Sequence, residues 1–323
     1  IFQIWIGKIL KPIRHMFPPL VTGIVVLMIG ISLLKVGFKY AGGGVWLMNN
    51  KPEVFANWEH LLIAGTVLIV ALLCNLRGKG MISSASILIG IIAGFIMAAL
   101  LGQISWGKIA AADWFALPMP FQYGIDFVWG AVILMLFMSI VTTIETIGDI
   151  SATTMGGANR EATNKELSGG IMADGVGTAF ASIFNAMPNT SYSQNAGLVA
   201  FTGVISRHVG TVAGVILILL GLFPKLGGII AAMPDSVIGG AAIIMFGLIA
   251  GAGIKLISKS EMSQRNILIL ALSLSFGIGL YAFPEFVAHI PDFGIKLKLL
   301  LTTGLIPAGL LAFVLNATLP TKK

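Results

Sequence analysis

Charged residues are scarce in this sequence. They make up 10% of its 323 residues, whereas hydrophobic residues make up 57%, and the mean hydropathy is +0.96. A soluble domain carries about 25% charged and about 45–50% apolar residues. The chain has too little polar surface to cover its apolar mass in water, so a soluble globular protein is excluded. Because a spanning helix needs about 20 apolar residues, the length allows about ten membrane crossings joined by short loops.

Cysteines and clustered metal ligands are also missing. The single cysteine, Cys74, excludes a disulfide within the chain and a cysteine-based metal cluster. The four histidines are far apart in the sequence, and no Ser/His/Asp arrangement or metal-ligand spacing is visible. These absences predict a protein that is not an enzyme and that holds neither a metal nor a cofactor.

The net charge of +7 would suggest a nucleic-acid partner if the protein were soluble. Here no run of Lys and Arg is interleaved with aromatic residues in a polar domain. Basic residues of membrane proteins collect in cytoplasmic loops, which accounts for the charge. The expected partner is therefore the lipid bilayer, with no nucleic acid.

What the sequence does contain is a series of long apolar stretches separated by charged or Gly- and Pro-rich breaks. All but one are long enough, or nearly so, to span a bilayer as helices, which predicts an all-α polytopic membrane protein. A more polar segment, 102–126, is expected to be a longer external loop. The stretches are 18–38, 60–76, 82–101, 127–147, 168–185, the broken segment 186–202, 209–230, 236–254, 266–283 and 297–316.

The distribution of Lys and Arg predicts the orientation. If the N-terminal flank is cytoplasmic and the stretches alternate across the membrane, thirteen of the twenty basic residues fall on the cytoplasmic side and six outside. The remaining one, Lys35, lies near the outer end of the first stretch and can snorkel. Because cytoplasmic loops carry an excess of Lys and Arg, both ends of the chain are predicted to be cytoplasmic.

The broken segment 186–202 starts with a polar run from Pro188 to Ser193. Backbone that is not helical is tolerated at membrane depth only where protein or a cavity covers it. We expect an extended stretch followed by a half-helix that begins near Ser193–Gln194, whose free N–H groups and positive dipole end would suit a substrate. The alternative is a polar re-entrant loop with a purely structural purpose.

Two carboxylates fall inside the apolar stretches, Glu145 and Asp174. A charge at the centre of a spanning helix costs about 2.5–3.5 kcal/mol on insertion scales, and such residues usually face the bundle interior and mark ion or substrate paths. Glu145 could instead lie near the cytoplasmic interface, with Asp149 just beyond it. Asp174 could instead be a structural hydrogen-bonding centre, since the glycines around it let helices approach closely.

The sequence QNAGLVAFTG at 194–203 resembles the signature of the nucleobase–ascorbate transporter family, [Q/E/P]-N-x-G-x-x-x-x-T-[R/K/G]. It agrees at every fixed position, which are Gln194, Asn195, Gly197, Thr202 and Gly203. Stretches such as FPPLVTGIVVLMIGISLL, ETIGDISATT and NAMPNTSYSQN are similar to the family too, so the resemblance covers nearly the whole chain.

The resemblance implies a fold of fourteen segments in two inverted seven-segment repeats, divided into a core domain and a gate domain. This chain would begin just before the fifth segment, so the first four segments, which belong to the core, are expected to be absent. The implied parts are a cytoplasmic flank at 1–17, a gate domain at 18–101 and 236–316, a core domain at 127–230 that includes the broken segment 186–202, and a cytoplasmic tail at 317–323.

The resemblance also implies roles for individual residues. Glu145 falls on the family's essential substrate-binding glutamate, and Asp149, one helical turn later, on a position tied to coupling or support. Asp174 matches a functionally important acid of the ninth segment. Gln194, at the first signature position, would bind substrate, and Asn195 would support the site.

The activity implied is import of a purine, xanthine and/or uric acid, together with protons by alternating access, in a bacterial-type inner membrane. Gln at the first signature position and Gly at the last resemble the xanthine and uric-acid branch. A uracil or other nucleobase carrier of the same family is the nearest alternative. A channel or anion exchanger with the same inverted-repeat fold is an alternative of another class. A homodimer through the gate domain is implied as well.

Overall fold

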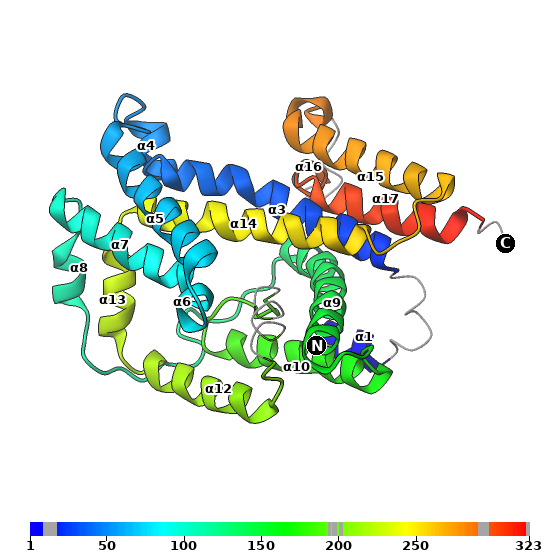
Figure 1. Cartoon of the computed structure of the whole chain (residues 1–323), viewed down its shortest axis with the longest axis horizontal. Coiled ribbons are helices and arrows are strands. Elements are labelled where there is room, and N and C mark those ends of the chain that lie inside the picture. The colour runs from blue at the N-terminus through cyan, green and yellow to red at the C-terminus, as the bar shows by residue number, and fades with distance from the viewer. Residues whose placement is uncertain (9–17, 193–194, 196–198, 200–202, 290–296, 321–323) are drawn as a thin grey trace. The chain divides into compact units, whose positions relative to one another are not determined.

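The structure is a computed structural model that describes residues 1–8, 18–192, 195, 199, 203–289 and 297–320. Within these residues the regular structure is all helical: helices are joined by turns and irregular segments, and there is no strand (Figure 1). The helices are α1 (Phe2–Lys8), α3 (Pro19–Ala41), α4 (Val45–Asn50), α5 (Trp58–Arg77), α6 (Met81–Ser84), α7 (Ser86–Leu100), α8 (Trp106–Ala111), α9 (Trp129–Ala158), α10 (Asn164–Ile183), α12 (Arg207–Gly221), α13 (Pro224–Ala232), α14 (Asp235–Ile257), α15 (Gln264–Ala282), η2 (Pro284–Val287, a 3-10 helix), α16 (Leu297–Thr302) and α17 (Leu305–Thr318).

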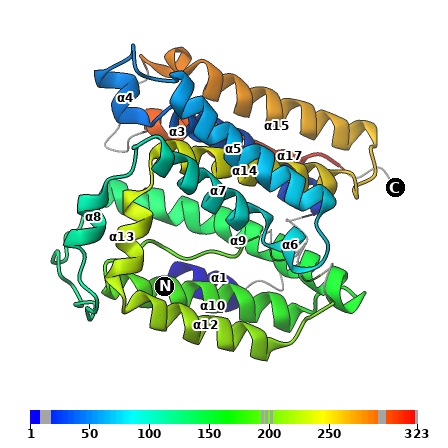
Figure 2. The ribbon, with the colours of Figure 1, turned by 60° about the vertical axis from the view of Figure 1, so that its left-hand side comes forward.

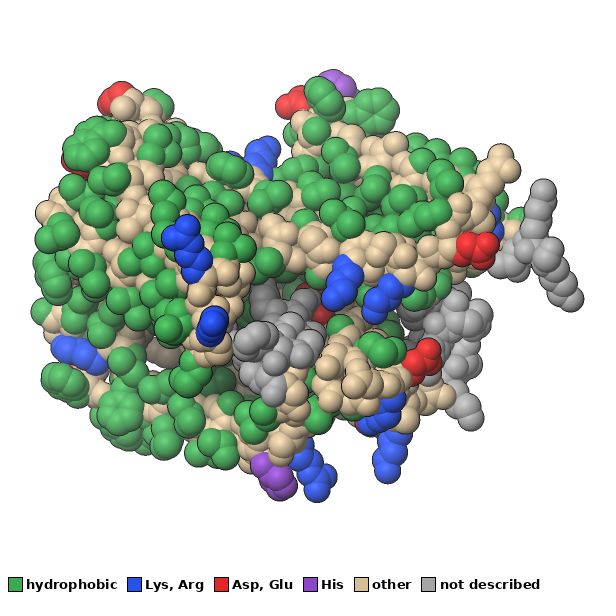
Figure 3. All heavy atoms as spheres, viewed as in Figure 1, with side chains coloured by type: hydrophobic (Ala, Val, Ile, Leu, Met, Phe, Trp, Pro, Cys, Tyr) green, Lys and Arg blue, Asp and Glu red, His purple; other side chains and the backbone are tan. Residues whose placement is uncertain are grey.

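Several of these helices match a bilayer in length and composition. Among the described residues, α3, α5, α9, α14 and α15 are each long and apolar enough to cross a membrane, and α7 and α17 are shorter apolar helices. Hydrophobic side chains cover most of the face seen in Figure 3, where charged groups are few. The predicted all-α polytopic membrane protein is therefore confirmed. The long helices begin where the apolar stretches predicted them, and α9 extends to Ala158, beyond the predicted end at 147.

The structure corrects three expected segments. The stretch 209–230 is bent by 82° between α12 and α13. Pro224 begins the second helix, and a proline at this position lacks the N–H that a continuous helix would need. The stretch 297–316 is interrupted before α17 by Gly304, whose φ of 68° is unfavourable for other residues. The expected external loop 102–126 contains the short helix α8.

The chain divides into two compact units. The first consists of Ile1–Ser32, Met119–Ile205 and Leu248–Lys323, and the second of Leu33–Pro118 and Ser206–Gly247. In the first unit α15 and α17 lie side by side (Figures 1 and 2). Its largest core cluster joins Leu20, Ile24 and Met28 of α3 to Ile269 of α15 and Ala308 of α17.

The second unit has its own core around α5 and α7. Ile63 and Val67 of α5 pack with Ala98 of α7 and Val237 of α14, and all four are buried. Polar groups close one end of this core, where the Nδ1 atom of His60 lies 3.1 Å from the Oγ atom of Ser236. Each unit thus buries a set of apolar residues that are distant in the sequence.

In the first unit, a short turn joins α9 to α10. Asn159 ends α9 in the left-handed conformation, and Thr163 begins α10 with a capping box, in which its hydroxyl accepts from the Glu166 N–H. Arg160 donates to both carboxylate oxygens of Glu166, and these bonds, with those from Thr163, hold the pKa of Glu166 well below its usual range. The stabilisation from this carboxylate is present at neutral pH and is lost when acid protonates it.

We expect Thr163→Ala to destabilise the first turn of α10 by about 1 kcal/mol, because the exposed helix N–H groups lose their cap. Amide hydrogen exchange at residues 164–167 should become faster, with Thr163→Ser exchanging like the unsubstituted protein. Unchanged exchange in Thr163→Ala would contradict the capping box.

Candidate functional site

One face of α9 carries the first polar groups of the site. Glu145 and Asp149 are four residues apart, so their side chains lie on the same side of the helix, one turn apart. Thr146 lies beside them and is 2% exposed, Asp149 is 8% exposed, and Glu145 is half-buried. The helix thereby presents two carboxylates and a hydroxyl to the interior of its unit.

Helix α10 adds a third carboxylate, Asp174. Its Oδ2 atom accepts a hydrogen bond of 2.5 Å from the Thr146 hydroxyl, a length typical of a hydroxyl bound to a carboxylate. Gly170 of α10 lies against Ile150 of α9, where an added Cβ would lie 2.2 Å from Cδ1 of Ile150 and would force that side chain to turn aside. Glu145 lies within electrostatic range of both Asp149 and Asp174.

The third element is the segment after α10, which is neither helix nor strand from Ala186 to Tyr192. The hydroxyl of Ser191 donates to Oδ2 of Asp149 at 2.8 Å and lies 3.5 Å from the Thr146 hydroxyl. Thr178 of α10 anchors the segment by donating to Oδ1 of Asn189 at 2.8 Å. Asp174, Thr146, Ser191 and Asp149 therefore form one continuous series of polar contacts across three elements.

The structure brings together only part of the predicted site. Glu145, Asp149 and Asp174 lie in the cluster just described. Asn195 is helical and exposed, and Gly203 has a φ of 68° with open space around it. The other three predicted residues, Gln194, Gly197 and Thr202, lie outside the described residues. Glu145 and Asp174 lie in the same unit, and the roles expected for them remain predictions.

Two contributors were missed from the sequence alone, Thr146 and Ser191. Both hydroxyls bind a carboxylate of the cluster. Their presence beside Glu145 and in the polar run 188–193 was the only available signal, because hydroxyl residues are common in membrane helices and bind their own backbone. Only the folded chain shows which hydroxyls meet which acids.

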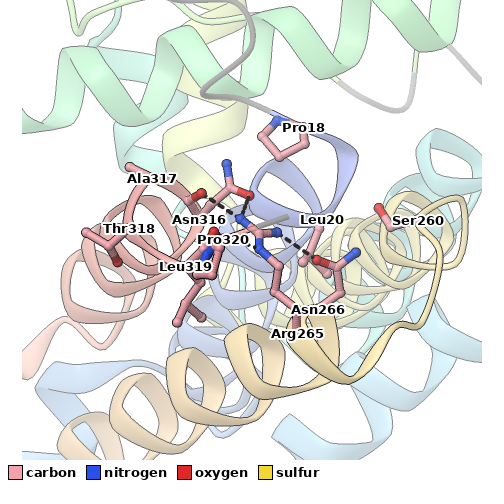
Figure 4. Close-up of a pocket in the computed structure, with 10 residues that line it drawn as sticks. All are labelled: Pro18, Leu20, Ser260, Arg265, Asn266, Asn316, Ala317, Thr318, Leu319 and Pro320. Atoms are coloured by element: carbon pink, nitrogen blue, oxygen red, sulfur yellow. Dashed lines mark hydrogen bonds between the residues drawn. The ribbon is translucent and has the colours of Figure 1, made fainter. Parts of the chain in front are cut away.

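A cavity of about 580 Å³ lies elsewhere in the first unit, at the ends of α3, α15 and α17 (Figure 4). Arg265 projects into it and donates to the backbone oxygens of Asn316 at 2.6 Å and Leu319 at 3.1 Å. These carbonyls belong to the C-terminal end of α17, where they lack partners within the helix. Arg265 therefore caps α17, and none of the predicted site residues lines this cavity.

Helices long and apolar enough to span a membrane, with acids and hydroxyls inside one unit, are typical of a membrane transport protein. Over residues 1–286 the sequence matches the Permease family. The xanthine permease XanP of Escherichia coli strain K12 is 35% identical over 324 residues, covering 98% of this chain and 68% of XanP. The xanthine permease XanQ of the same strain is 36% identical, covering 97% and 66%. The uric acid permease PucJ of Bacillus subtilis strain 168 is 34% identical, covering 98% and 70%.

The chain therefore belongs to the permease family, and the resemblance inferred from residues 194–203 is confirmed. Its members are transporters, so the prediction that the protein is not an enzyme is confirmed as well. Xanthine and uric acid are named for the relatives. Whether they suit this chain depends on the chemistry of its own residues.

Proposed function

We propose that the protein imports a purine, xanthine and/or uric acid, together with protons, by alternating access. The observation that carries the proposal is the position of Glu145 beside Asp149 and Asp174, in a cluster built by three elements of a permease-family chain. Relatives named as xanthine and uric acid permeases support the purine.

The chemistry of the proposed substrate suits these groups. A purine such as xanthine presents N–H donors and C=O acceptors along its edges. An ionised Glu145 accepts hydrogen bonds only, whereas the amide of Gln194 both donates and accepts. We propose that Glu145 and Gln194 bind complementary parts of the purine edge, with Asn195 in support.

Proton coupling is assigned to the acids. Asp149 and Asp174 each accept a hydrogen bond from a hydroxyl. Protonation of either carboxylate would change the hydrogen bonds that join the segment 186–192 to α9 and α10. A proton that moves down a potential of 100 mV releases about 2.3 kcal/mol, enough for about fifty-fold accumulation of substrate.

The proposal includes the family's architecture. We assign 127–230 to a core domain that carries the substrate, and 18–101 with 236–316 to a gate domain that also forms the contact of a homodimer. These belong to two inverted repeats. The excess of Lys and Arg in alternate loops supports an inner-membrane protein with both ends of this chain in the cytoplasm.

Competition of radiolabelled xanthine uptake tests the substrate. The full-length protein is expressed in cells that lack purine permeases, and uric acid, uracil, guanine and hypoxanthine are added in excess. We expect uric acid to compete and uracil to have no effect. Inhibition by uracil alone would point to a pyrimidine carrier, and conductance of anions without purine uptake would point to a channel or exchanger.

We expect Thr146→Val to reduce xanthine uptake by about 10–100-fold, because Asp174 loses a hydrogen bond to a charged group worth about 1.5–3 kcal/mol. Valine keeps the shape of threonine, so packing is preserved. Thr146→Ser keeps the hydroxyl and should retain most of the uptake. Wild-type uptake by Thr146→Val, at equal protein in the membrane, would remove Thr146 from the site.

A further inference from the structure

Helix α13 runs across the direction of its neighbour α12. The two apolar helices of the second unit meet at 82° at a break of a few residues. If α12 crosses the bilayer, a helix at this angle lies close to the membrane plane. Helix α8 packs against it (Figures 1 and 2), so the two short helices form one layer at the end of α12.

The pair is held together by its own charges. Lys108 of α8 donates to the backbone oxygen of Ala231, at the end of α13, at 3.0 Å. Lys225 of α13 donates to that of Ala112, just after α8, at 2.9 Å. Both ammonium groups thus satisfy carbonyls at the end of the neighbouring helix. Gly228 allows the close contact, since a Cβ there would lie 2.8 Å from that of Ala112.

Exposed large apolar side chains lie on α8 and α13 and in the residues just beyond them. We call this set, Trp106, Trp114, Phe115, Phe223 and Ile230, the aromatic face. Trp114 is 74% exposed and Trp106 61% exposed. The Phe115 and Phe223 rings pack edge to face with centroids 6.4 Å apart. The Lys225 Nζ atom lies 5.2 Å from the centre of the Trp114 ring. This cation–π contact links the Trp114 side chain to α13.

We propose that the aromatic face rests in the headgroup–acyl boundary of the bilayer and anchors α8 and α13 there. Tryptophan combines an apolar ring with one N–H donor, which is why it concentrates at membrane interfaces. The neighbouring helix α12 also exposes apolar side chains, among them Ile218. Helices of this kind lie with their apolar side about 5–10 Å into the boundary. Residues 106–117 are then a membrane-bound layer, where the sequence predicted an external loop.

The inference depends on the membrane class of the protein and not on its substrate. A protein partner is the competing occupant of the face. Lipid is favoured because α12, to which α13 is joined, carries many exposed hydrophobic side chains, and because both lysines already bind backbone oxygens instead of facing a partner's carboxylates.

Spin labels test the location in the full-length protein reconstituted in phosphatidylcholine nanodiscs. Cys74, the only cysteine of this sequence, is replaced by serine together with any cysteine in the rest of the full-length protein. This gives a background for a label introduced by Trp114→Cys. Ile216→Cys on α12 is the lipid control, and Glu53→Cys, in an exposed turn, is the water control. We expect the Trp114→Cys label to collide with oxygen and with a water-soluble nickel chelate to an extent between the two controls.

Collision rates equal to those of Glu53→Cys would overturn the proposal in favour of a loop in water. Protection from both reagents would overturn it in favour of a protein partner. A second measurement keeps Trp114 and needs no label: the other tryptophans are replaced by phenylalanine, and lipids brominated near the headgroup should quench Trp114 fluorescence more than lipids brominated near the acyl end. Absence of quenching by both lipids would overturn the proposal, because Trp114 would then lie away from the bilayer. The replaced residues of this sequence are Trp5, Trp46, Trp58, Trp106 and Trp129, together with any tryptophan in the rest of the full-length protein.

Discussion

Glu145→Gln is expected to abolish purine uptake while leaving insertion into the membrane intact. Glutamine has nearly the same shape, so α9 keeps its packing. Its amide, however, places an N–H where the carboxylate accepts, against a purine edge that donates there. The loss of a hydrogen bond to a charged group, with a buried donor left unpaired, corresponds to about 100-fold or more in uptake. Initial rates of radiolabelled xanthine uptake measure it, normalised to protein in the membrane.

The matched control is Glu161→Gln, the same substitution at an exposed residue of the turn after α9. It should transport like the unsubstituted protein. Normal xanthine uptake by Glu145→Gln would refute both the role of Glu145 and the purine assignment, whereas loss of uptake in both variants would indicate damage that does not depend on the site.

Gly253→Ala is expected to have the largest effect on stability. Gly253 is a buried residue of α14, where an added Cβ would lie 2.4 Å from the backbone nitrogen of Leu27 on α3 and 2.6 Å from its Cα. Backbone atoms cannot turn aside as a side chain can, so the two helices must separate. Overpacking of this kind costs about 1–3 kcal/mol or more. Thermal unfolding in detergent can be monitored by the loss of monodisperse protein. The midpoint temperature of Gly253→Ala should be lower than that of the unsubstituted protein.

Gly251→Ala, on the same helix, is the control. No atom lies within 4 Å of an added Cβ at this position, and alanine favours a helix over glycine by about 1 kcal/mol. This variant should therefore unfold at the same or a higher temperature. Equal midpoints for Gly253→Ala and the unsubstituted protein would contradict the close contact of α3 and α14.

Much of the fold could be predicted because its signal is local. Long apolar stretches gave α3, α5, α14 and α15 nearly to their ends, since a helix must satisfy its own backbone in lipid whatever its neighbours are. Helix α9 continues to Ala158, eleven residues beyond the predicted stretch 127–147. The bend between α12 and α13 was not predicted, although Pro224 stands at its centre. A proline can kink, end or begin a helix, and neighbouring segments decide which of these occurs.

For the candidate site, the sequence by itself determined the chemistry available. An acid inside an apolar stretch is costly wherever the helix packs, so Glu145 and Asp174 could be selected before any contact was known, and the signature at 194–203 indicated the family. Only the tertiary structure decided that Thr146 bridges to Asp174 and that Ser191 binds Asp149. A hydrogen bond depends on the distance and angle between two atoms, and residues 28 and 42 positions apart in the chain acquire that geometry only when α9, α10 and the segment after α10 pack together.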